Sequence, residues 1–237
     1  MMDSAFYSDI GGRSCNEDSV IIKSAGDEKM LAVVADGLGG HGGGQIASAI
    51  ATETVAGGWN GTATPESLSE LIQKAHRKIL SGQTSGRKMK STVAVLSLTG
   101  RHMDWAYVGD SRLYHFTDGR LVFQTRDHSA SQIAVLMGQI APEQIRFHED
   151  RSRIFRALGQ EGSLKVDAQS RSLSPGNHAF LLCSDGFWEY VYESEMEDTL
   201  AQSASVAEWL KKMRAILAAR IPGDNDNNTA AAIWLTV

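Results

Sequence analysis

The sequence has too few cysteines for a disulfide framework, and it has no long hydrophobic run. Among its 237 residues only Cys15 and Cys183 are cysteines, and their spacing matches no zinc motif, so we expect two reduced thiols. No apolar run approaches the roughly 20 residues that cross a bilayer. Residues 1–4 lack the basic and apolar regions of a signal peptide. These absences predict a cytoplasmic chain with no membrane partner.

Positive charge is scarce as well. The chain has 23 lysines and arginines against 28 aspartates and glutamates, a net charge of −5. Since no basic cluster is present, a nucleic-acid partner is not expected. A hydrophobic content of 42% with 22% charged residues is typical of a globular protein. No shift in composition divides the chain, so we expect one domain over residues 1–237 and a monomer.

What the sequence does contain is an apolar run, residues 32–35, that ends in Asp36-Gly37 and is followed by five more glycines within seven residues. This pattern predicts a buried strand that delivers one carboxylate into a tight loop. One Asp-Gly alone is also a common turn signal. A structural turn and a metal ligand therefore both remain open for Asp36.

The same pattern recurs where an apolar strand, residues 178–184, runs into Asp185-Gly186. Asp18, Asp110 and Asp226 also lie where predicted strands meet loops. Antiparallel strands would bring these carboxylates to one rim, where they raise each other's pKa unless cations neutralise them. Mg²⁺ and Mn²⁺ prefer such oxygen ligands. We therefore expect bound divalent metals, which in pairs support phosphoester hydrolysis.

Arg13 is the natural phosphate ligand, because its planar guanidinium donates to two oxygens at once. The alternative is an ion pair with Glu17 or Asp18, its neighbours in the same loop.

Periodicity and turn signals predict the remaining elements. From 127 to 150 the pattern is irregular, and loops of this length often serve as lids or recognition segments. Gly159 is expected to end a short helix over 151–158. The predicted strands are 5–9, 19–25, 91–98, 103–108, 112–116, 120–124 and 230–237, and helices begin near 45, 65 and 131, with two more between 186 and 220.

Seven short motifs, taken in order, cover nearly the whole chain. They are Arg13-x-x-Asn16-Glu17-Asp18, Asp36-Gly37-x-Gly39-Gly40-His41, Ser91-Thr92-Val93, Gly109-Asp110-Ser111-Arg112, Ala157-Leu158-Gly159, Ser184-Asp185-Gly186 and Asp226-Asn227-x-Thr229. Together they resemble the PP2C-type metal-dependent protein serine/threonine phosphatases in their bacterial stand-alone form. The resemblance implies an α+β fold, a four-layer α-β-β-α sandwich of two antiparallel sheets flanked by helices.

The resemblance also implies roles for the motif residues around two Mn²⁺ or Mg²⁺ ions. Asp36 would bridge both ions, the Gly37 carbonyl would bind one, and Asp185 and Asp226 would complete a shell. Asp18 would be a further ligand, and Arg13 would receive the substrate phosphate. A third, weaker metal would be held by Asp110 with Asp185. Glu17, His41 and Asn227 would support these ligands, and residues 127–150 would form a flap that contacts substrate.

Two residues depart from the family pattern. Leu38 stands where animal members carry a histidine that is a candidate general acid, so the acid is unassigned here. Gln45 stands where bacterial members usually have glutamate. We expect His41 to orient its loop by hydrogen bonding, because a general acid must reach the leaving oxygen.

The predicted function is hydrolysis of phosphoserine and phosphothreonine in proteins, in opposition to a bacterial serine/threonine kinase. By resemblance to small bacterial members of the family, the opposing kinase could be one that controls a type VI secretion apparatus. Two-metal carboxylate sites also serve nucleases and small-molecule phosphatases, but the acidic chain does not favour a nuclease. A non-catalytic module that binds phosphoproteins would have lost metal ligands, and here every motif ligand is present.

Overall fold

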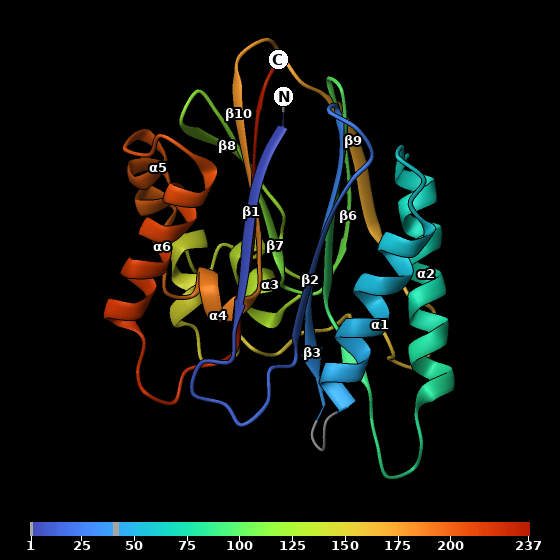
Figure 1. The fold of residues 1–237 in the computed structure, drawn as a ribbon. Coiled ribbons are helices and arrows are strands. Elements are labelled where there is room, and N and C mark those ends of the chain that lie inside the picture. The colour runs from blue at the N-terminus through green and yellow to red at the C-terminus, as the bar shows by residue number, and fades with distance from the viewer. Residues whose placement is uncertain (1, 40–42) are drawn as a thin grey trace.

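Two antiparallel sheets lie face to face with helices on their outer surfaces, as the computed structural model shows (Figure 1). The structure describes residues 2–39 and 43–237. Both termini lie at one end of the sandwich, and the loop that follows β1 lies at the other (Figure 1). This arrangement confirms the predicted four-layer fold.

The first sheet has the strand order β1-β11-β10-β7-β8, and the second β2-β3-β5-β6-β9, with the short β4 paired to β3. Every pairing is antiparallel. The first sheet comprises β1 (Met2–Asp9), β11 (Asn228–Thr236), β10 (Asn177–Cys183), β7 (Arg112–Thr117) and β8 (Arg120–Gln124). The second comprises β2 (Asp18–Ser24), β3 (Lys29–Leu38), β4 (Lys90–Ser91), β5 (Val93–Thr99), β6 (His102–Val108) and β9 (Asp167–Ser172).

Each sheet is covered by one pair of long helices. The helices α1 (Gly43–Gly58) and α2 (Pro65–Gly82) cover the second sheet, and α5 (Glu193–Ala201) and α6 (Val206–Arg220) cover the first (Figure 1). The short elements α3 (Ala130–Leu136) and η1 (Pro142–Phe147) lie between β8 and β9 in the chain, and α4 (Asp185–Trp188) follows β10. No helix of the described residues is both long enough and apolar enough to cross a membrane.

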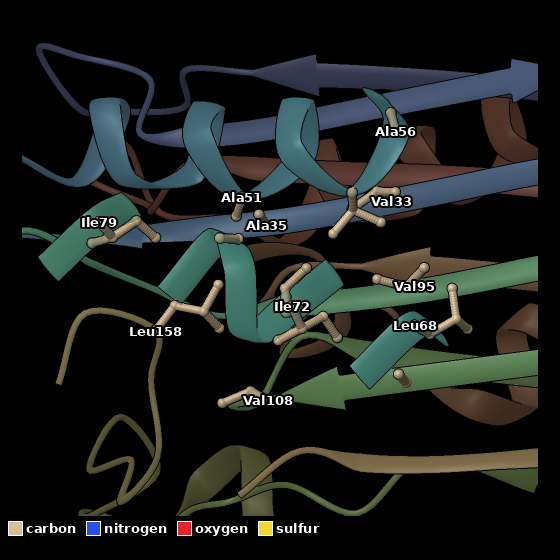
Figure 2. Close-up of a cluster of buried hydrophobic side chains, with 14 of the residues drawn as sticks. Val33, Ala35, Ala51, Ala56, Leu68, Ile72, Ile79, Val95, Val108 and Leu158 are labelled. Carbon is tan, nitrogen blue, oxygen red and sulfur yellow. The ribbon is translucent and has the colours of Figure 1, made fainter. Parts of the chain in front are cut away.

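The central strands are apolar on both faces because each lies between two layers. In β3, residues 31, 33 and 35 pack under α1 and α2, whereas residues 30, 32 and 34 lie between the sheets. In β10, residues 179, 181 and 183 face α5 and α6, and residues 180 and 182 face the other sheet. Figure 2 shows Ala51 of α1 beside Ala35 of β3, where small side chains bring helix and sheet together. The continuous apolar runs that end in Asp36 and Asp185 are thus core strands.

Two details differ from the predicted elements. Residues 151–158 form no helix, because their backbone groups pair elsewhere: the Leu158 amide donates to the Ser91 carbonyl at 2.8 Å, and the Phe155 amide donates to the His128 carbonyl at 2.7 Å. The predicted helix there is wrong. The strand β9 was not predicted, because its sequence is polar and it lies at a sheet edge, largely exposed.

The predicted flap, residues 127–150, contains α3 and η1. It is anchored to the body of the protein by Arg146, which is buried and donates to the carbonyl of Trp188 and to the carboxylate of Glu193. The segment is therefore packed against the structure that follows β10.

Candidate active site

The predicted site residues come together in one pocket of about 560 Å³ at the end of the sandwich away from the termini. Four of them are carboxylates from separate parts of the chain: Asp36, Asp110, Asp185 and Asp226. Arg13, Glu17, Gly37 and Asn227 line the same pocket. Two predicted members remain: Asp18 does not line the pocket but lies opposite Asp36 in the register of β2 and β3, and His41 lies outside the described residues.

Asp36 is held in place through its backbone. The Thr92 amide donates to the Asp36 carbonyl at 2.8 Å, and the Asp36 amide donates to the Thr92 hydroxyl at 3.0 Å. The Ser91 hydroxyl also donates to the Asp36 carbonyl. The next residue must be glycine, since a Cβ on Gly37 would stand 2.2 Å from the carbonyl oxygen of Gly44. The Ser-Thr-Val motif therefore fixes the position of the first aspartate.

Asp185 is held by the residue before it and the residue after it. The Ser184 hydroxyl accepts from the Thr229 amide at 3.0 Å and donates to Oδ2 of Asp18 at 2.7 Å. A Cβ on Gly186 would stand 2.1 Å from the Asn227 carbonyl oxygen. Asp18 itself lies opposite Asp36 in the register of β2 and β3. Ser184 thus connects the two sheets at the pocket.

Asn227 organises the loop that carries Arg13. Its side-chain oxygen accepts from the Glu17 amide at 2.8 Å, and its Nδ2 donates to the carbonyls of Ile10 and Cys15 at 2.7 and 3.0 Å. Arg13 forms an ion pair with Asp226 at 2.9 Å, and both side chains are about half exposed. The sequence offered Glu17 and Asp18 as ion-pair partners of Arg13, but in the structure Arg13 pairs with Asp226.

Asp110 is buried and is fixed by contacts on two sides of its loop. The Gly109 amide donates to Nδ1 of His128 at 3.0 Å, and Nε1 of Trp188 donates to the Asp110 carbonyl at 3.0 Å. Gly109 has a φ of +104°, which favours glycine. The Trp188 contact ties the loop to the short helix that Asp185 begins.

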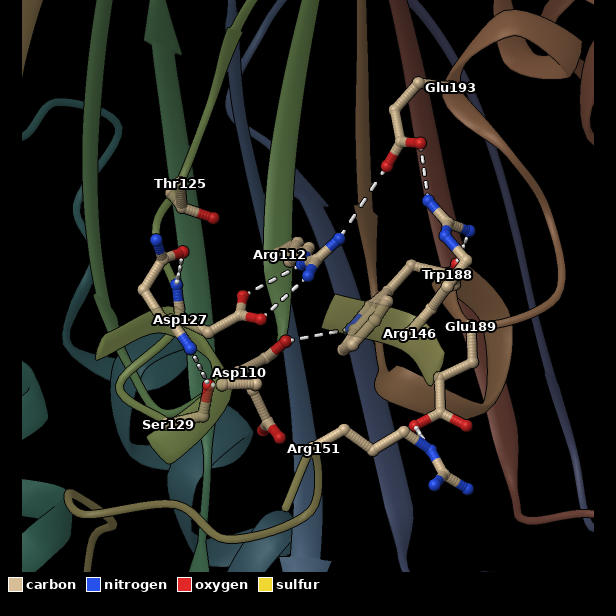
Figure 3. A network of polar contacts seen from close by, with 12 residues as sticks. Asp110, Arg112, Thr125, Asp127, Ser129, Arg146, Arg151, Trp188, Glu189 and Glu193 are labelled. Carbon is tan, nitrogen blue, oxygen red and sulfur yellow. Dashed lines mark hydrogen bonds and ion pairs between the residues drawn. The ribbon is translucent and has the colours of Figure 1, made fainter. Parts of the chain in front are cut away.

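Beside the pocket lies a network of buried ion pairs that was not predicted from the sequence (Figure 3). Arg112 donates twice to Asp127, at 2.8 and 2.7 Å, and its guanidinium stacks 3.5 Å from the centre of a Trp188 ring. Glu193 accepts from Arg146 and lies 3.7 Å from Arg112. The motif containing Arg112 was recognised from the sequence, but the ion-pair partners of Arg112 are distant from it along the chain. No spacing pattern in the sequence therefore predicted these ion pairs.

Four carboxylates at or beside the pocket, those of Asp18, Asp36, Asp110 and Asp185, have raised pKa values, for two physical reasons. Burial first, and then repulsion from Asp185, raises the pKa of Asp36 well above its usual range. Burial and then Asp110 do the same to the pKa of Asp185. Burial also raises the pKa of Asp110 to about 7 and that of Asp18 to about 6. These carboxyl groups therefore give up their protons less readily than ordinary ones, unless a bound cation offsets the burial and the repulsion.

The donor set fits a hard divalent cation in its chemistry. Oδ1 of Asp18 is buried and has no hydrogen-bond partner within the described residues. All predicted side-chain ligands are carboxylate oxygens, as such cations prefer. Within residues 2–39 and 43–237, no three acidic, histidine or cysteine side chains already stand together as a ligand set. A cation would require the carboxylates to turn toward it.

Three comparisons with known proteins show what this chain is similar to. The family described as Protein phosphatase 2C matches residues 7–228. The serine/threonine phosphatase stp of Listeria welshimeri is 30% identical over 98% of this chain and 95% of its own. The catalytic domain of the serine threonine protein phosphatase PstP, solved in complex with two manganese ions, has a TM-score of 0.83 at 28% identity, covering 98% of this chain and 97% of that one. PppA of Pseudomonas aeruginosa, described as a key regulatory component of type VI secretion, has a TM-score of 0.78 at 26% identity over 98% of this chain and 96% of its own.

The chain belongs to the protein phosphatase 2C family. This finding confirms the family, the fold and the phosphatase class that the seven motifs predicted.

Proposed function

We propose that this protein hydrolyses phosphoserine and phosphothreonine in other proteins, with divalent cations in the acidic pocket. The observation that carries the proposal is the gathering of Asp36, Asp110, Asp185 and Asp226 in one pocket with Arg13 at its rim. Uncompensated carboxylates next to an exposed arginine suit cations on one side and a phosphoryl group on the other. The serine/threonine phosphatases among the relatives support the substrate class.

Each cation would be held by residues of this chain. Asp36, Asp185 and Asp226, with the Gly37 carbonyl, would hold two cations, and Asp18 would add its unpartnered oxygen. Asp110 with Asp185 would hold a third. Glu17 and Asn227 would keep the loop beneath them in place.

Arg13 would bind the phosphoryl group of the substrate. Its guanidinium is exposed and now pairs with Asp226, so it can exchange one anionic oxygen for another. Once released by Arg13, Asp226 is free to turn into the pocket. We therefore expect phosphate binding by Arg13 and cation binding by Asp226 to favour each other.

The cations would be Mn²⁺ or Mg²⁺, and the two manganese ions in the PstP structure support this choice. When bound, they would supply a water of lowered pKa as nucleophile and would polarise the phosphoryl oxygens.

The partner class would be phosphoproteins made by a serine/threonine kinase. The PppA similarity supports a type VI secretion context for one such kinase. In this proposal residues 1–237 act as one catalytic domain and as a monomer in the cytoplasm, with the flap over 127–150 beside the pocket.

The test measures hydrolysis of a phosphothreonine peptide, its phosphotyrosine counterpart and a chromogenic aryl phosphate, each in Mn²⁺, in Mg²⁺ and in chelator. We expect cation-dependent hydrolysis that favours phosphothreonine. The substitution Asp36→Asn should lower kcat/KM by about a thousandfold, or roughly 4 kcal/mol, because it removes one charge that holds the cations.

The matched control is Asp198→Asn, which makes the same change at an exposed position of α5 and should leave activity unchanged. Turnover that persists in chelator, or full activity of Asp36→Asn, would contradict the proposal. A preference for small sugar phosphates over every phosphopeptide would favour the small-molecule alternative.

A further inference from the structure

His128 binds the residue before Asp110 through two hydrogen bonds. The Gly109 amide donates to Nδ1 of the His128 ring at 3.0 Å, and the His128 amide donates to the Gly109 carbonyl at 2.9 Å. Both backbone groups of Gly109 are therefore bound by one residue, which lies 19 positions further along the chain. Gly109 is buried, so water does not replace either bond.

The hydrogen bonds around the His128 ring define its protonation state. Nδ1 accepts from an amide, so it carries a lone pair, and the proton of the neutral ring is on Nε2. Nε2 then donates to Oδ2 of Asp167 at 3.0 Å. Arg156 has donors only, so it competes with the ring for Asp167 instead of bonding to Nε2. Burial lowers the pKa of His128, which agrees with a neutral ring.

The ring is held in this orientation by the second sheet. It stacks on Tyr107 of β6, with ring centres 5.0 Å apart and planes 10° from parallel. Asp167, which accepts from Nε2, is the first residue of β9. The His128 side chain is 8% exposed. The ring therefore cannot turn away from Gly109 without losing the stack and the bond to Asp167.

On its other side, the loop that carries Asp110 packs against Thr92, whose hydroxyl accepts from the Asp36 amide. A Cβ on Gly109 would stand 2.6 Å from Cγ2 of Thr92, and the hydroxyls of Thr92 and Ser111 are 2.6 Å apart. If the Nδ1 acceptor were lost, the Gly109 amide would be buried without a partner, and a glycine peptide can rotate to relieve this cost. Such a rotation would move Asp110 relative to Asp36.

We propose that His128 is a positioning residue: its ring fixes Gly109 and thereby holds the Asp110 carboxylate where it can bind a cation together with Asp185. The inference rests on the proposed function, which assigns a cation to these two aspartates. Removing a residue that orients a metal ligand changes metal affinity by about 10- to 100-fold.

The experiment measures Mn²⁺ binding by calorimetry, beside the cation dependence of hydrolysis. His128→Phe keeps a buried ring next to Tyr107 but has no acceptor for the Gly109 amide. We expect the affinity for the weakest-bound Mn²⁺ to fall about tenfold, as it should in Asp110→Asn, while tighter sites are unchanged. In the double variant the His128 substitution should add nothing, because the Asp110 carboxylate is already gone. A general effect on the fold would add to that of Asp110→Asn.

Two amide variants decide the question even if His128→Phe does not fold. His128→Asn places an oxygen acceptor at the position of Nδ1, whereas His128→Gln places its amide one bond further from the backbone. The asparagine variant should therefore bind the weakest Mn²⁺ more tightly than the glutamine variant.

His115→Phe is the matched control. His115 is also buried and also stacked on an aromatic ring, that of Phe180 at 4.6 Å, but it does not line the catalytic pocket. This variant should leave Mn²⁺ binding unchanged.

Nitrogen NMR of the imidazole rings tests the geometry in the absence of any cation. In metal-free protein at pH 7.5, His128 should carry its proton on Nε2. A proton on Nδ1 would prevent that atom from accepting from the Gly109 amide, and it overturns the inference.

The results separate this inference from the proposed function. Unchanged Mn²⁺ binding in His128→Phe, equal affinities of the two amide variants, or additive losses in the double variant overturn the positioning role alone. If Asp110→Asn binds every Mn²⁺ as the wild type does, the cation proposed for Asp110 is overturned, and the positioning role with it. Absence of cation-dependent hydrolysis of every phosphoester overturns the proposed function first.

Discussion

Two clusters of buried charge lie side by side in this protein, and they are built in opposite ways. In the ion-pair network, Asp127 faces Arg112 and Glu193 faces Arg146. In the catalytic pocket, Asp36, Asp110 and Asp185 lie near one another, and burial followed by repulsion from neighbouring carboxylates raises their pKa values. Trp188 belongs to both, because its Nε1 binds the Asp110 carbonyl and its ring stacks on Arg112 (Figure 3).

The difference separates carboxylates that support the fold from carboxylates that can bind a ligand. A buried carboxylate that is paired with a guanidinium holds segments together, and its oxygens are not available to a ligand. Carboxylates that repel one another weaken the fold, and they persist where a cation is to be bound. The network therefore acts as a support for Asp110 and Asp185, while the pocket retains the charge that the reaction needs.

Removing one partner from the network should have the largest effect on stability. Arg112→Met leaves Asp127 buried and unpaired, so we expect the free energy of unfolding to fall by about 3–5 kcal/mol. Chemical denaturation at pH 7.5 measures this loss.

A double variant tests whether the loss arises from the unpaired charge. Arg112→Met combined with Asp127→Leu removes both charges and should recover most of the stability. If the double variant were as unstable as the single one, packing around Trp188 rather than charge would be the cause.

The pocket should make the metal-free protein less stable as the pH rises. Asp110 has a pKa near 7 in the folded protein and an ordinary value of 3.8, so between pH 4 and 7 the folded state binds more protons than the unfolded state. Stability contributed by the protonated carboxyl is present at low pH and is lost as the pH rises through 7. The loss is on the order of 4 kcal/mol.

A histidine distant from the pocket acts in the opposite direction over the same pH range. Burial lowers the pKa of His115 to about 4 from 6.5, so its contribution to stability is complete above pH 6.5 and is lost as the pH falls from 6.5 through 4. The measurement is therefore the difference between the wild type and Asp110→Asn, followed by denaturation in chelator from pH 4.5 to 8. Saturating Mn²⁺ should flatten the difference, since the cation displaces protons. A difference that does not change with pH would mean that Asp110 is ionised throughout.

How far the sequence predicted this molecule depends on how local each signal is. The strands that end in Asp36 and Asp185 were predictable, because residues packed on both faces leave a continuous apolar run. Segment 151–158 was not, since its backbone pairs with residues far along the chain, Ser91 among them.

In the candidate site, too, only features with a local sequence pattern could be predicted. Its carboxylates were found because Asp-Gly at a strand end is a local pattern that recurs. The ion-pair network was missed because Arg112 finds Asp127 and Glu193 only in three dimensions, 15 and 81 positions away. The sharing of Trp188 between the two clusters has no local signature either.

One substitution made in both clusters gives the sharpest form of the comparison. In metal-free protein at pH 7.5, Asp36→Asn removes the cost of placing an ionisable carboxyl where burial and then repulsion from Asp185 and Asp18 disfavour its charged form, so we expect stability to rise by about 1 kcal/mol. Asp127→Asn, the same chemical change, leaves Arg112 without its charged partner and should lower stability. Denaturation of the two variants beside the wild type, in chelator, measures both signs. A loss of stability in Asp36→Asn would show that the pocket carboxylates contribute more through hydrogen bonds and packing than they cost through repulsion, and the distinction between the clusters would then fail.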